Sequence, residues 1–326
     1  MESVAVIIPN YNGKKYLNDC LKSLEKQTYR DFSVIVVDNG SEDGSLEYLK
    51  NNFPSVRVIS LGSNTGFANA VNEGIRASDS KYVFLLNNDT VCDEGAIESL
   101  VKVLDSKPKV FSAQAKMLRM KEPHLVDDAG DYYCALGWTV VPSKDKESEL
   151  FSKRKQITSA CAGAAVYRRE VFDKIGMFDE AHFCYLEDVD VGYRARLFGY
   201  DNVMEPSAVV YHVGSGSSGS RYNTFKVELT ASNNLYFIYK NMAVWQLIIN
   251  LPLVLLGIII KHIFYTRKGL GTAHIKGLFK GIARIFKNSH KRVRFGGDKL
   301  LASIGLQFEL WLNIFLLVGR LFVFKK

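Results

Sequence analysis

The chain has 326 residues, 47% of them hydrophobic, so it is long enough to bury a large core and too apolar to be intrinsically disordered. Its net charge of +8 is uneven: residues 261–299 hold 11 Lys and Arg against one acid, Asp298, a net of +10, so the remaining chain carries −2. The five cysteines are odd in number and lack metal-like spacing, which argues against a disulfide scaffold and favours a reduced, intracellular catalytic part.

Strand and helix patterns alternate over the first 120 residues. The chain starts without the basic and long apolar regions of a signal peptide, so its first apolar run is interpreted as a strand. Continuous apolar runs separated by amphipathic helices indicate a parallel sheet covered on both faces, whose ligands bind beyond the carboxyl ends of the strands. The predicted strands are Val4–Pro9, Phe32–Val37, Val56–Leu61 and Lys81–Leu86, and the predicted helices are Lys14–Gln27, Ser45–Asn52 and Ala68–Ala77.

Polar residues follow each of these four strands. One such stretch is a plausible turn or helix cap, because Asn, Asp, Ser and Gly favour both. The carboxyl ends of parallel strands share one edge of the sheet, so four polar stretches there predict a binding edge. They are Pro9-Asn10-Tyr11-Asn12-Gly13, Asp38-Asn39-Gly40-Ser41-Glu42-Asp43, Gly62-Ser63-Asn64-Thr65-Gly66-Phe67 and Asn87-Asn88-Asp89-Thr90.

The middle of the chain places three acids, Glu187, Asp188 and Asp190, at the start of a predicted helix. Acids in a first turn are stabilised by the helix dipole, and Asp190 is spaced to form a solvent-exposed pair with Arg194. A carboxylate directed into a cleft beside other acids would instead have a raised pKa and could act as a general base. The pattern allows both interpretations. Before these acids, a strand is predicted over Val110–Leu118 and a loop or hairpin over Asp127–Trp138.

His212 ends a predicted apolar strand, where a histidine is normally a core or rim residue. Asp89 and His212 together would suit Mg²⁺ or Mn²⁺, which keeps few protein ligands and binds through substrate phosphates. The following sequence GSGSSG, Gly214–Gly219, matches a dinucleotide motif, but no second strand with a terminal acid follows it. We therefore expect a flap that orders over a ligand.

Seven motifs follow one another from Val4 to about Gly216: VIIPNYNG, VVDNGSEDGS, NTGFANAVNEGI, FLLNNDT, CAGAAVYRREVFDKIGMFDE, LEDVDVGYRARLFGY and PSAVVYH. In this order they resemble the family 2 glycosyltransferases of the GT-A fold, most closely the rhamnosyltransferase-like branch. The resemblance implies an α/β GT-A-type nucleotide-diphospho-sugar transferase domain over residues 1–220, with a mostly parallel sheet covered by helices. Residues 221–326 would form a helical, basic and apolar membrane-associating region.

The resemblance also implies roles for the matching residues. Asp188 would be the catalytic base, next to Glu187, and Asp89 and His212 would meet the metal. Asn87 departs from the family pattern, because many relatives carry Asp at this first position of D-x-D, so the metal would have one less anionic protein contact. The implied donor-binding residues are Pro9, Asn10, Tyr11 and Asn12 in the nucleotide pocket, Asp38 at the pyrimidine base, Asn64 and Gly66 near the ribose and diphosphate, and Asn87 and Asn88.

The implied activity is metal-dependent transfer of a single sugar with inversion, because one base and no evident nucleophile favour a single in-line displacement. The donor would be a UDP- or dTDP-sugar, with rhamnose the best guess, and the acceptor a glycan or lipid-linked glycan in cell-surface polysaccharide synthesis. The Gln-x-x-Arg-Trp signature of processive synthases is absent from the sequence. A polyprenyl-phosphate sugar synthase of the same fold and a catalytically silent nucleotide-sugar-binding scaffold are the alternatives. Nucleic-acid binding is not expected, and a homo-oligomer is compatible with the sequence.

Two apolar segments, Ala243–Ile260 and Leu300–Phe324, flank a basic one. Between them an apolar stripe and a basic stripe recur at helical spacing, as in a membrane-surface helix, although Gly277 and Gly281 would weaken it. A single crossing by the first segment would put the +10 segment outside the cell, against the positive-inside rule. We therefore expect both segments to lie at the cytoplasmic face of the cell membrane, with two spans, a buried helical domain or a dimer interface as alternatives. The stripes are Ile275, Leu278, Phe279, Ile282 and Phe286, and Lys276, Lys280, Arg284 and Lys287.

Overall fold

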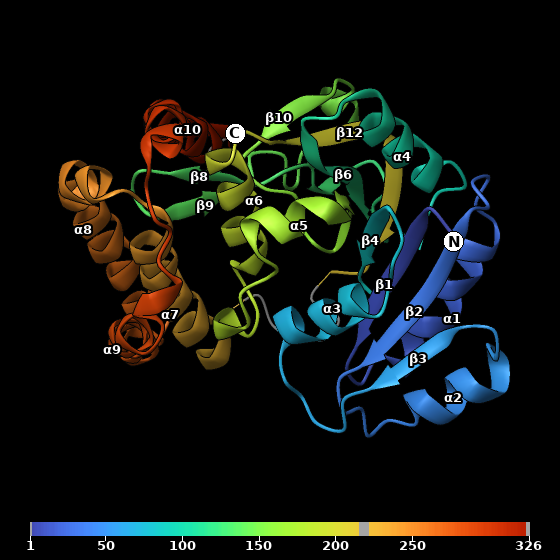
Figure 1. Ribbon diagram of the computed structural model, residues 1–326. Helices are drawn as coiled ribbons and strands as arrows, with labels where there is room; N and C mark the ends of the chain where they lie inside the picture. Colours follow the sequence, from blue (N-terminus) through green and yellow to red (C-terminus); the bar gives the residue numbers. More distant parts are fainter. Residues whose placement is uncertain (1, 215–221, 324–326) are drawn as a thin grey trace.

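A ten-stranded sheet forms the centre of the protein (Figure 1). The computed structural model describes residues 2–214 and 222–323. The main strand order is β10-β12-β6-β11-β4-β1-β2-β3, with β5 paired to β12 and β7 to β6, and β8 and β9 form a separate hairpin. The strands are β1 Val4–Asn10, β2 Phe32–Asp38, β3 Arg57–Ser60, β4 Tyr82–Leu86, β5 Thr90–Cys92, β6 Val110–Arg119, β7 Val126–Asp128, β8 Tyr132–Cys134, β9 Trp138–Val140, β10 Lys155–Ile157, β11 Ala164–Arg168 and β12 Asp201–His212.

The sheet is mostly parallel, as the sequence predicts. β1 pairs in parallel with β2 and β4, β2 with β3, and β6 with β12. The exceptions on the main path are β11, antiparallel to β4 and β6, and the short β10, antiparallel to β12. The carboxyl ends of β1, β2 and β4 therefore meet at one edge of the sheet.

Helices cover both faces of this sheet. Two buried clusters lie on its opposite faces, one beneath α1, α2 and α4 and the other beneath α3, α5 and α6. The strand and helix predictions for the first 86 residues are confirmed to within a few residues at each boundary, whereas β5 and α4 were not predicted. The helices are α1 Lys14–Glu25, α2 Ser45–Asn52, α3 Phe67–Arg76, α4 Ala96–Ser106, α5 Arg169–Ile175 and α6 Glu187–Leu197, with short 3-10 turns at Ser148–Phe151, Glu180–His182 and Ser289–Lys291.

The C-terminal third is helical and shares a core with the sheet domain. Side chains from α7, α8 and α10 pack with α6 and the β8–β9 hairpin in a third buried cluster. The predicted domain boundary at residue 220 stays a prediction, because residues 215–221, and with them most of the predicted Gly214–Gly219 flap, lie outside the described residues. The helices are α7 Thr224–Asn241, α8 Val244–Arg267, α9 Gly271–Lys287 and α10 Gly297–Val323.

Gly277 and Gly281, which were expected to weaken the α9 helix, allow it to pack closely against α7. A Cβ on Gly277 would lie 2.5 Å from the Glu228 carbonyl oxygen of α7, and one on Gly281 would lie 2.9 Å from the Ser232 carbonyl oxygen. The two glycines therefore let α9 lie directly against the α7 backbone. The predicted basic stripe of α9 is partly paired with α7, since Lys280 forms an ion pair with Glu228 of α7.

Two of the described helices are long and apolar enough to cross a membrane by length and composition: α8, and α10 from Gly297 to Gly319. Both, however, are attached near their midpoints to the β8–β9 hairpin. Gly257 of α8 accepts a hydrogen bond from Trp138 Nε1 at 3.2 Å, and Leu310 of α10 accepts one from the Ala135 backbone at 2.9 Å. α8 packs against α9 and contacts α10, and all three helices lie on the side of the molecule away from α2 (Figure 1).

Candidate active site

A cleft of about 1460 Å³ opens at the carboxyl ends of β1, β2 and β4 and continues past the start of α6 to α7 and α8. Most of the predicted site residues meet there, although they come from distant parts of the chain. The predicted residues that line it are Pro9, Asn10, Tyr11, Asn64, Asn87, Asn88, Asp89, Glu187, Asp188 and His212.

A chain of hydrogen bonds orders the floor of the cleft. Asn88 donates to Asn10 Oδ1 at 2.7 Å, and Asn10 donates to Asp38 Oδ1 at 2.9 Å. Gly13 allows this arrangement, because a Cβ there would lie 1.9 Å from Asn88 Nδ2. Asp38 is fully buried, does not line the cleft, and accepts a second hydrogen bond from the Ser41 backbone. In this structure Asp38 fixes Asn10, and its contact with a nucleotide base stays a prediction.

Asn12 and Gly66 are the other predicted residues that do not line the cleft. The side chain of Asn12 accepts a backbone hydrogen bond from the loop that follows β2, at 2.8 Å. Gly66 has φ of +93°, and a Cβ there would lie 2.6 Å from the ring of Phe183. Asn39, which is not among the predicted site residues, does line the cleft and donates to Asn64 Oδ1 at 3.1 Å.

Strand pairing brings Asp89 and His212 together. β5 begins directly after Asp89 and pairs with the end of β12, so that Thr90 lies opposite His212. His212 Nε2 lies 3.2 Å from Asp89 Oδ1, and His212 Nδ1 lies 2.7 Å from Oδ2 of Asp127 in β7. The imidazole therefore sits between two carboxylates.

The Asp89–His212 pair could hold a divalent cation only if the cation displaces a proton. Burial disfavours a charged imidazole, but the two carboxylates outweigh it and raise the pKa of His212 to about 9, so a cation bound at Nε2 would replace the proton there. Against the effect of burial, the hydrogen bond with His212 and the charge of Lys144 hold the pKa of Asp127 well below its usual range. A carboxylate on the far nitrogen is the common way to orient a metal-binding imidazole. No group of three or more potential protein ligands gathers among the described residues, so oxygens of a bound substrate would complete the coordination.

A second group of acids faces the cleft at the start of α6. Burial raises the pKa of Asp188 to about 6, with the Asp128 charge adding to it and the Val189 backbone N–H opposing it. Burial and the adjacent Asp188 raise the pKa of Glu187 well above its usual range, and its buried Oε2 has no hydrogen-bond partner among residues 2–214 and 222–323. Asp131, also in the cleft, has its pKa raised by burial and by Asp128 and Asp188. Burial and mutual repulsion therefore disfavour the charged forms of these neighbouring acids.

The loop before α6 has an uncommon backbone conformation. Phe183, Tyr185 and Leu186 all have positive φ, between 63° and 68°, which bulky side chains rarely adopt. Asn233 of α7 supports this loop, because its Nδ2 donates to three loop carbonyl oxygens at 2.7–2.8 Å. α7 thus fixes the segment that directs the first turn of α6 into the cleft.

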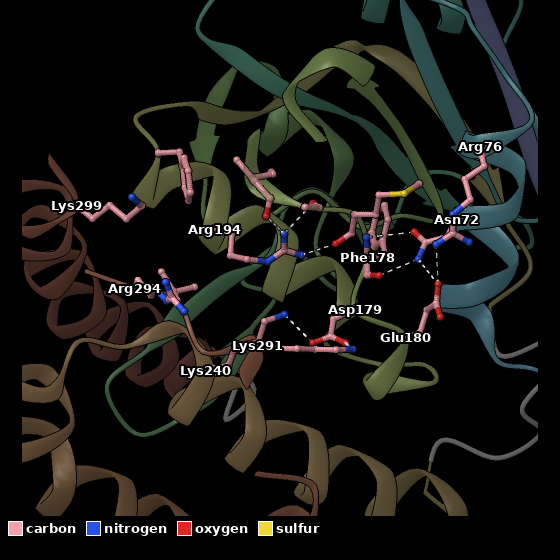
Figure 2. A pocket seen from close by; sticks show the side chains of 15 residues that line it. Asn72, Arg76, Phe178, Asp179, Glu180, Arg194, Lys240, Lys291, Arg294 and Lys299 are labelled. Atoms are coloured by element: carbon pink, nitrogen blue, oxygen red, sulfur yellow. Dashed lines mark hydrogen bonds and ion pairs between the residues drawn. The ribbon is translucent and has the colours of Figure 1, made fainter. Parts of the chain in front are cut away.

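Asp190 points into the interior, so the prediction of a solvent-exposed pair with Arg194 is wrong. The i,i+4 contact exists, at 2.7 Å, but the Asp190 side chain has no exposed surface. The reason lies in α7: Lys240 contacts Asp190 at 3.0 Å, and Asn241 donates to it at 2.7 Å. Lys240 also contacts Asp179 at 2.8 Å, as Figure 2 illustrates. Two carboxylates and two cations therefore join α6 to α7 in a buried ion network.

A second cavity, of about 570 Å³, lies over this ion network (Figure 2). Several cations line it, but most of them are already paired inside the protein. Lys291 contacts Asp179 at 2.8 Å, and Arg76 contacts Glu180 at 3.1 Å. We therefore regard the second cavity as part of the ion network and propose no ligand for it.

Sequence reasoning missed four residues that shape the first cleft. Asp127, Asp131 and Lys261 line it, and Asn233 holds the loop before α6. None of them lies in a strand-end stretch of the first 90 residues. The sequence offered one signal for these residues, the acidic pair that follows Val126. Asp89 had been selected as a candidate for the same reason, because it directly follows an apolar run.

Comparison with known proteins gives a family match. A family profile described as "Glycosyl transferase family 2" matches residues 5–176, more than half of the chain. The N-acetylglucosaminyl-diphospho-decaprenol L-rhamnosyltransferase of Mycobacterium tuberculosis is 29% identical over 237 residues, covering 66% of this chain and 77% of that protein.

Solved structures share the fold. The crystal structure of GalNAc-T7 with UDP, GalNAc and Mn²⁺ aligns with a TM-score of 0.59 and 15% identity, covering 73% of this chain and 48% of that one. The mannosyltransferase PcManGT from Pyrobaculum calidifontis, in complex with GDP-Man and Mn²⁺, aligns with a TM-score of 0.54 and 16% identity, covering 95% of this chain and 81% of that one. At these identities the similarity is one of fold, and it is the GT-A-type fold that the sequence predicts.

Proposed function

The chain belongs to glycosyl transferase family 2 and is a glycosyltransferase, and on that premise we propose that it moves one sugar from a nucleotide donor to a lipid-linked glycan. Rhamnose, carried by dTDP or UDP, is the proposed sugar, because the mycobacterial relative is named for rhamnosyl transfer to a diphospholipid-linked sugar. The acceptor oxygen attacks the anomeric carbon while the bond from that carbon to the nucleoside diphosphate breaks. One displacement of this kind inverts the anomeric centre.

The observation that carries the proposal is the presence of Asp188 and the Asp89–His212 pair in one cleft. Asp188 accepts the proton of the attacking hydroxyl, and its pKa near 6 leaves it ionised at neutral pH. A positioned base of this kind contributes about 10²–10⁴-fold to the rate. Burial and the charge of Asp188 raise the pKa of the adjacent Glu187, which disfavours a second negative charge beside the base.

Asp89 and His212 are the proposed protein ligands of Mg²⁺ or Mn²⁺. A bound divalent cation would offset the negative charge that grows on the diphosphate as it leaves. Asp127 orients the imidazole of His212 and stabilises its position through a second hydrogen bond. Asn87 lines the cleft beside Asp89 and supplies a neutral amide at the position where many relatives have an acid.

The strand-end residues are proposed to bind the donor. Tyr11 is 41% exposed in the cleft, so its ring is free to meet a nucleotide base, and Asn10 is fixed beneath it by Asp38 and Asn88. Asn64 is held by Asn39 at the same edge, toward the ribose and diphosphate. The side-chain amides of Asn10 and Asn64 are suited to hydrogen bonds with uncharged polar groups of the donor.

We place the protein on the cytoplasmic face of the cell membrane, lying on its surface. The hairpin contacts at Gly257 and Leu310 support this placement, because spanning helices would carry polar hairpin backbone to the bilayer centre. All three helices expose large apolar side chains, and Arg267 and Lys287 at helix ends are exposed cations for anionic headgroups. An acceptor held in that membrane would present its glycan to the cleft.

Thermal unfolding with a panel of nucleotides, each with and without Mn²⁺ or Mg²⁺, tests the donor site. A metal-dependent rise in Tm with dTDP or UDP that Asp89→Ala removes is the expected result, because a ligand that binds only the folded state stabilises it. Asp173→Ala, which removes an exposed acid of α5 outside the cleft, is the control. The absence of a shift with any nucleotide would point to a protein that does not use a nucleotide donor.

A further inference from the structure

A lysine of α8 lies where the apolar helices meet the catalytic cleft. Lys261 is half-buried and lines the same cleft as Asp188. Its ammonium lies 5.2 Å from the centre of the Trp138 ring, which faces it from the β8–β9 hairpin. Among residues 2–214 and 222–323, no carboxylate forms an ion pair with it, unlike Lys240 and Lys280 elsewhere in the helical region.

Over the residues that the structure describes, the neighbouring helix α9 places a histidine rather than a carboxylate near Lys261. His262 follows it, and His274 of α9 stacks on His262 with ring centres 5.7 Å apart. His274 is 2% exposed, and its Nδ1 has no hydrogen-bond partner within the described part of the chain. Burial lowers the pKa of Lys261 to about 8, and burial together with the charge of Lys261 lowers the pKa of His274 to about 4. A partly buried cation of this kind gains most from an anionic ligand.

Apolar surface begins immediately beside this cation. Phe264, one turn beyond Lys261 on the same face of α8, is 40% exposed, and Tyr265 beside it lines the cleft. A molecule that joins a hydrocarbon chain to a sugar through phosphate would place its chain on the apolar face and its sugar toward Asp188. Its phosphate would then lie at the junction between them.

We propose that Lys261 binds the phosphate group that links the lipid to the glycan in the acceptor. This inference rests on the proposed function and deepens it, because it assigns the acceptor's anionic group to a named residue. The ammonium acts as a point charge for phosphate, and the Trp138 ring holds it at the mouth of the cleft.

Equilibrium binding in neutral-detergent micelles tests this role with farnesyl diphosphate, farnesol and inorganic pyrophosphate as probes. The full-length protein should bind farnesyl diphosphate more tightly than either of the other two, and Lys261→Met should weaken that binding about 10- to 100-fold, the effect of one charge-assisted hydrogen bond. Lys261→Arg should restore most of the affinity. Lys268→Met, which removes an exposed cation just after the same helix and outside the cleft, should bind like wild type.

Two further arms separate the competing explanations. Unchanged farnesyl diphosphate binding in Lys261→Met, with normal dTDP or UDP binding, overturns the role of Lys261 and leaves the proposed function intact. If neither wild type nor Lys261→Met binds dTDP or UDP, the proposed function itself is wrong. If Lys261→Met loses binding to phosphatidylglycerol in the micelles but keeps farnesyl diphosphate, the residue is a membrane-headgroup contact and the inference is wrong.

Discussion

Asp127 accepts a hydrogen bond from His212 Nδ1 at 2.7 Å, while the other ring nitrogen of His212 faces Asp89 at 3.2 Å. The contact joins β7 to the end of β12, across 85 residues of chain. The contact fixes the orientation of the imidazole that we propose as a metal ligand.

Asp127→Asn is predicted to weaken Mn²⁺ binding in the presence of nucleotide by about 10- to 100-fold, the usual effect of losing a carboxylate behind a metal-binding imidazole. Electron paramagnetic resonance of free and bound Mn²⁺ measures this directly. Asp173→Asn, on the exposed side of α5, should leave the affinity unchanged. Wild-type Mn²⁺ affinity in Asp127→Asn would show that His212 needs no orienting partner.

Asn233→Leu is predicted to lower kcat by about 10²-fold, because the loop that directs α6 loses the amide that holds it, and small misplacements of catalytic groups have large effects. The three carbonyl oxygens left unpaired should also cost about 1–3 kcal/mol of stability. Asn313→Leu removes another buried amide, which bonds the Tyr133 carbonyl, and should cost stability without a matching loss of kcat. Equal kcat in the two variants, measured under saturating donor, would refute the positioning role.

Lys240→Met is predicted to destabilise the protein by about 3–5 kcal/mol, because it leaves Asp179 and Asp190 buried with too little positive charge. Denaturant unfolding measures the change, and Lys291→Met is the matched control, since Lys291 is more exposed and contacts only Asp179. The control should cost about 1 kcal/mol or less. Equal costs in the two variants would contradict a buried network centred on Lys240.

The same network predicts a pH dependence. Against the effect of burial, Arg194 and Lys240 hold the pKa of Asp190 well below its usual range. A carboxyl group whose pKa is depressed by folding stabilises the protein fully above its unfolded pKa near 4 and loses that contribution as the pH falls toward the folded value. The difference in stability between wild type and Lys240→Met should therefore shrink as the pH is lowered below about 4.

Phe279→Gln combined with Phe286→Gln is predicted to weaken binding to vesicles that contain phosphatidylglycerol by at least about tenfold, since each ring is worth about 1.5–3 kcal/mol when buried in lipid. The two rings are 68% and 76% exposed on α9, so the fold should not depend on them. Leu46→Gln combined with Leu150→Gln removes exposed apolar side chains that belong to none of the three C-terminal helices and should not change vesicle binding. Alkaline carbonate should release the wild-type protein from vesicles, and resistance to that wash would favour spanning helices.

The sequence was sufficient where function lies in local patterns. Asp89 directly follows a continuous apolar strand, so it could be located from its neighbours along the chain. The acids at the start of α6 were also visible in the sequence, but only the family resemblance singled out Asp188 among them. The positions of the first four strands along the chain also follow from their apolar runs, because buried parallel strands are apolar throughout. Ten of the predicted site residues consequently line the same cleft.

The sequence was insufficient where partners come from far along the chain. Asp190 looked solvated beside Arg194 because nothing near it indicates that Lys240, 50 residues later, enters the same pocket. Asp38 ends a strand as expected, but its orientation depends on the Asn10 amide from another strand. Gly277 and Gly281 lower helix propensity in isolation, and only contact with α7 reveals why α9 has them.

The central claim is that Asp188 is the base of an inverting sugar transfer, and the most direct test is kcat against pH for wild type and Asp188→Asn with dTDP- or UDP-rhamnose. Because the pKa of Asp188 is raised to about 6, wild-type kcat should rise through about pH 6 and then level off. Asp188→Asn should lower kcat by about 10²–10⁴-fold across the range while its donor affinity stays unchanged. Near wild-type turnover in Asp188→Asn, with the same rise near pH 6, would contradict the assignment.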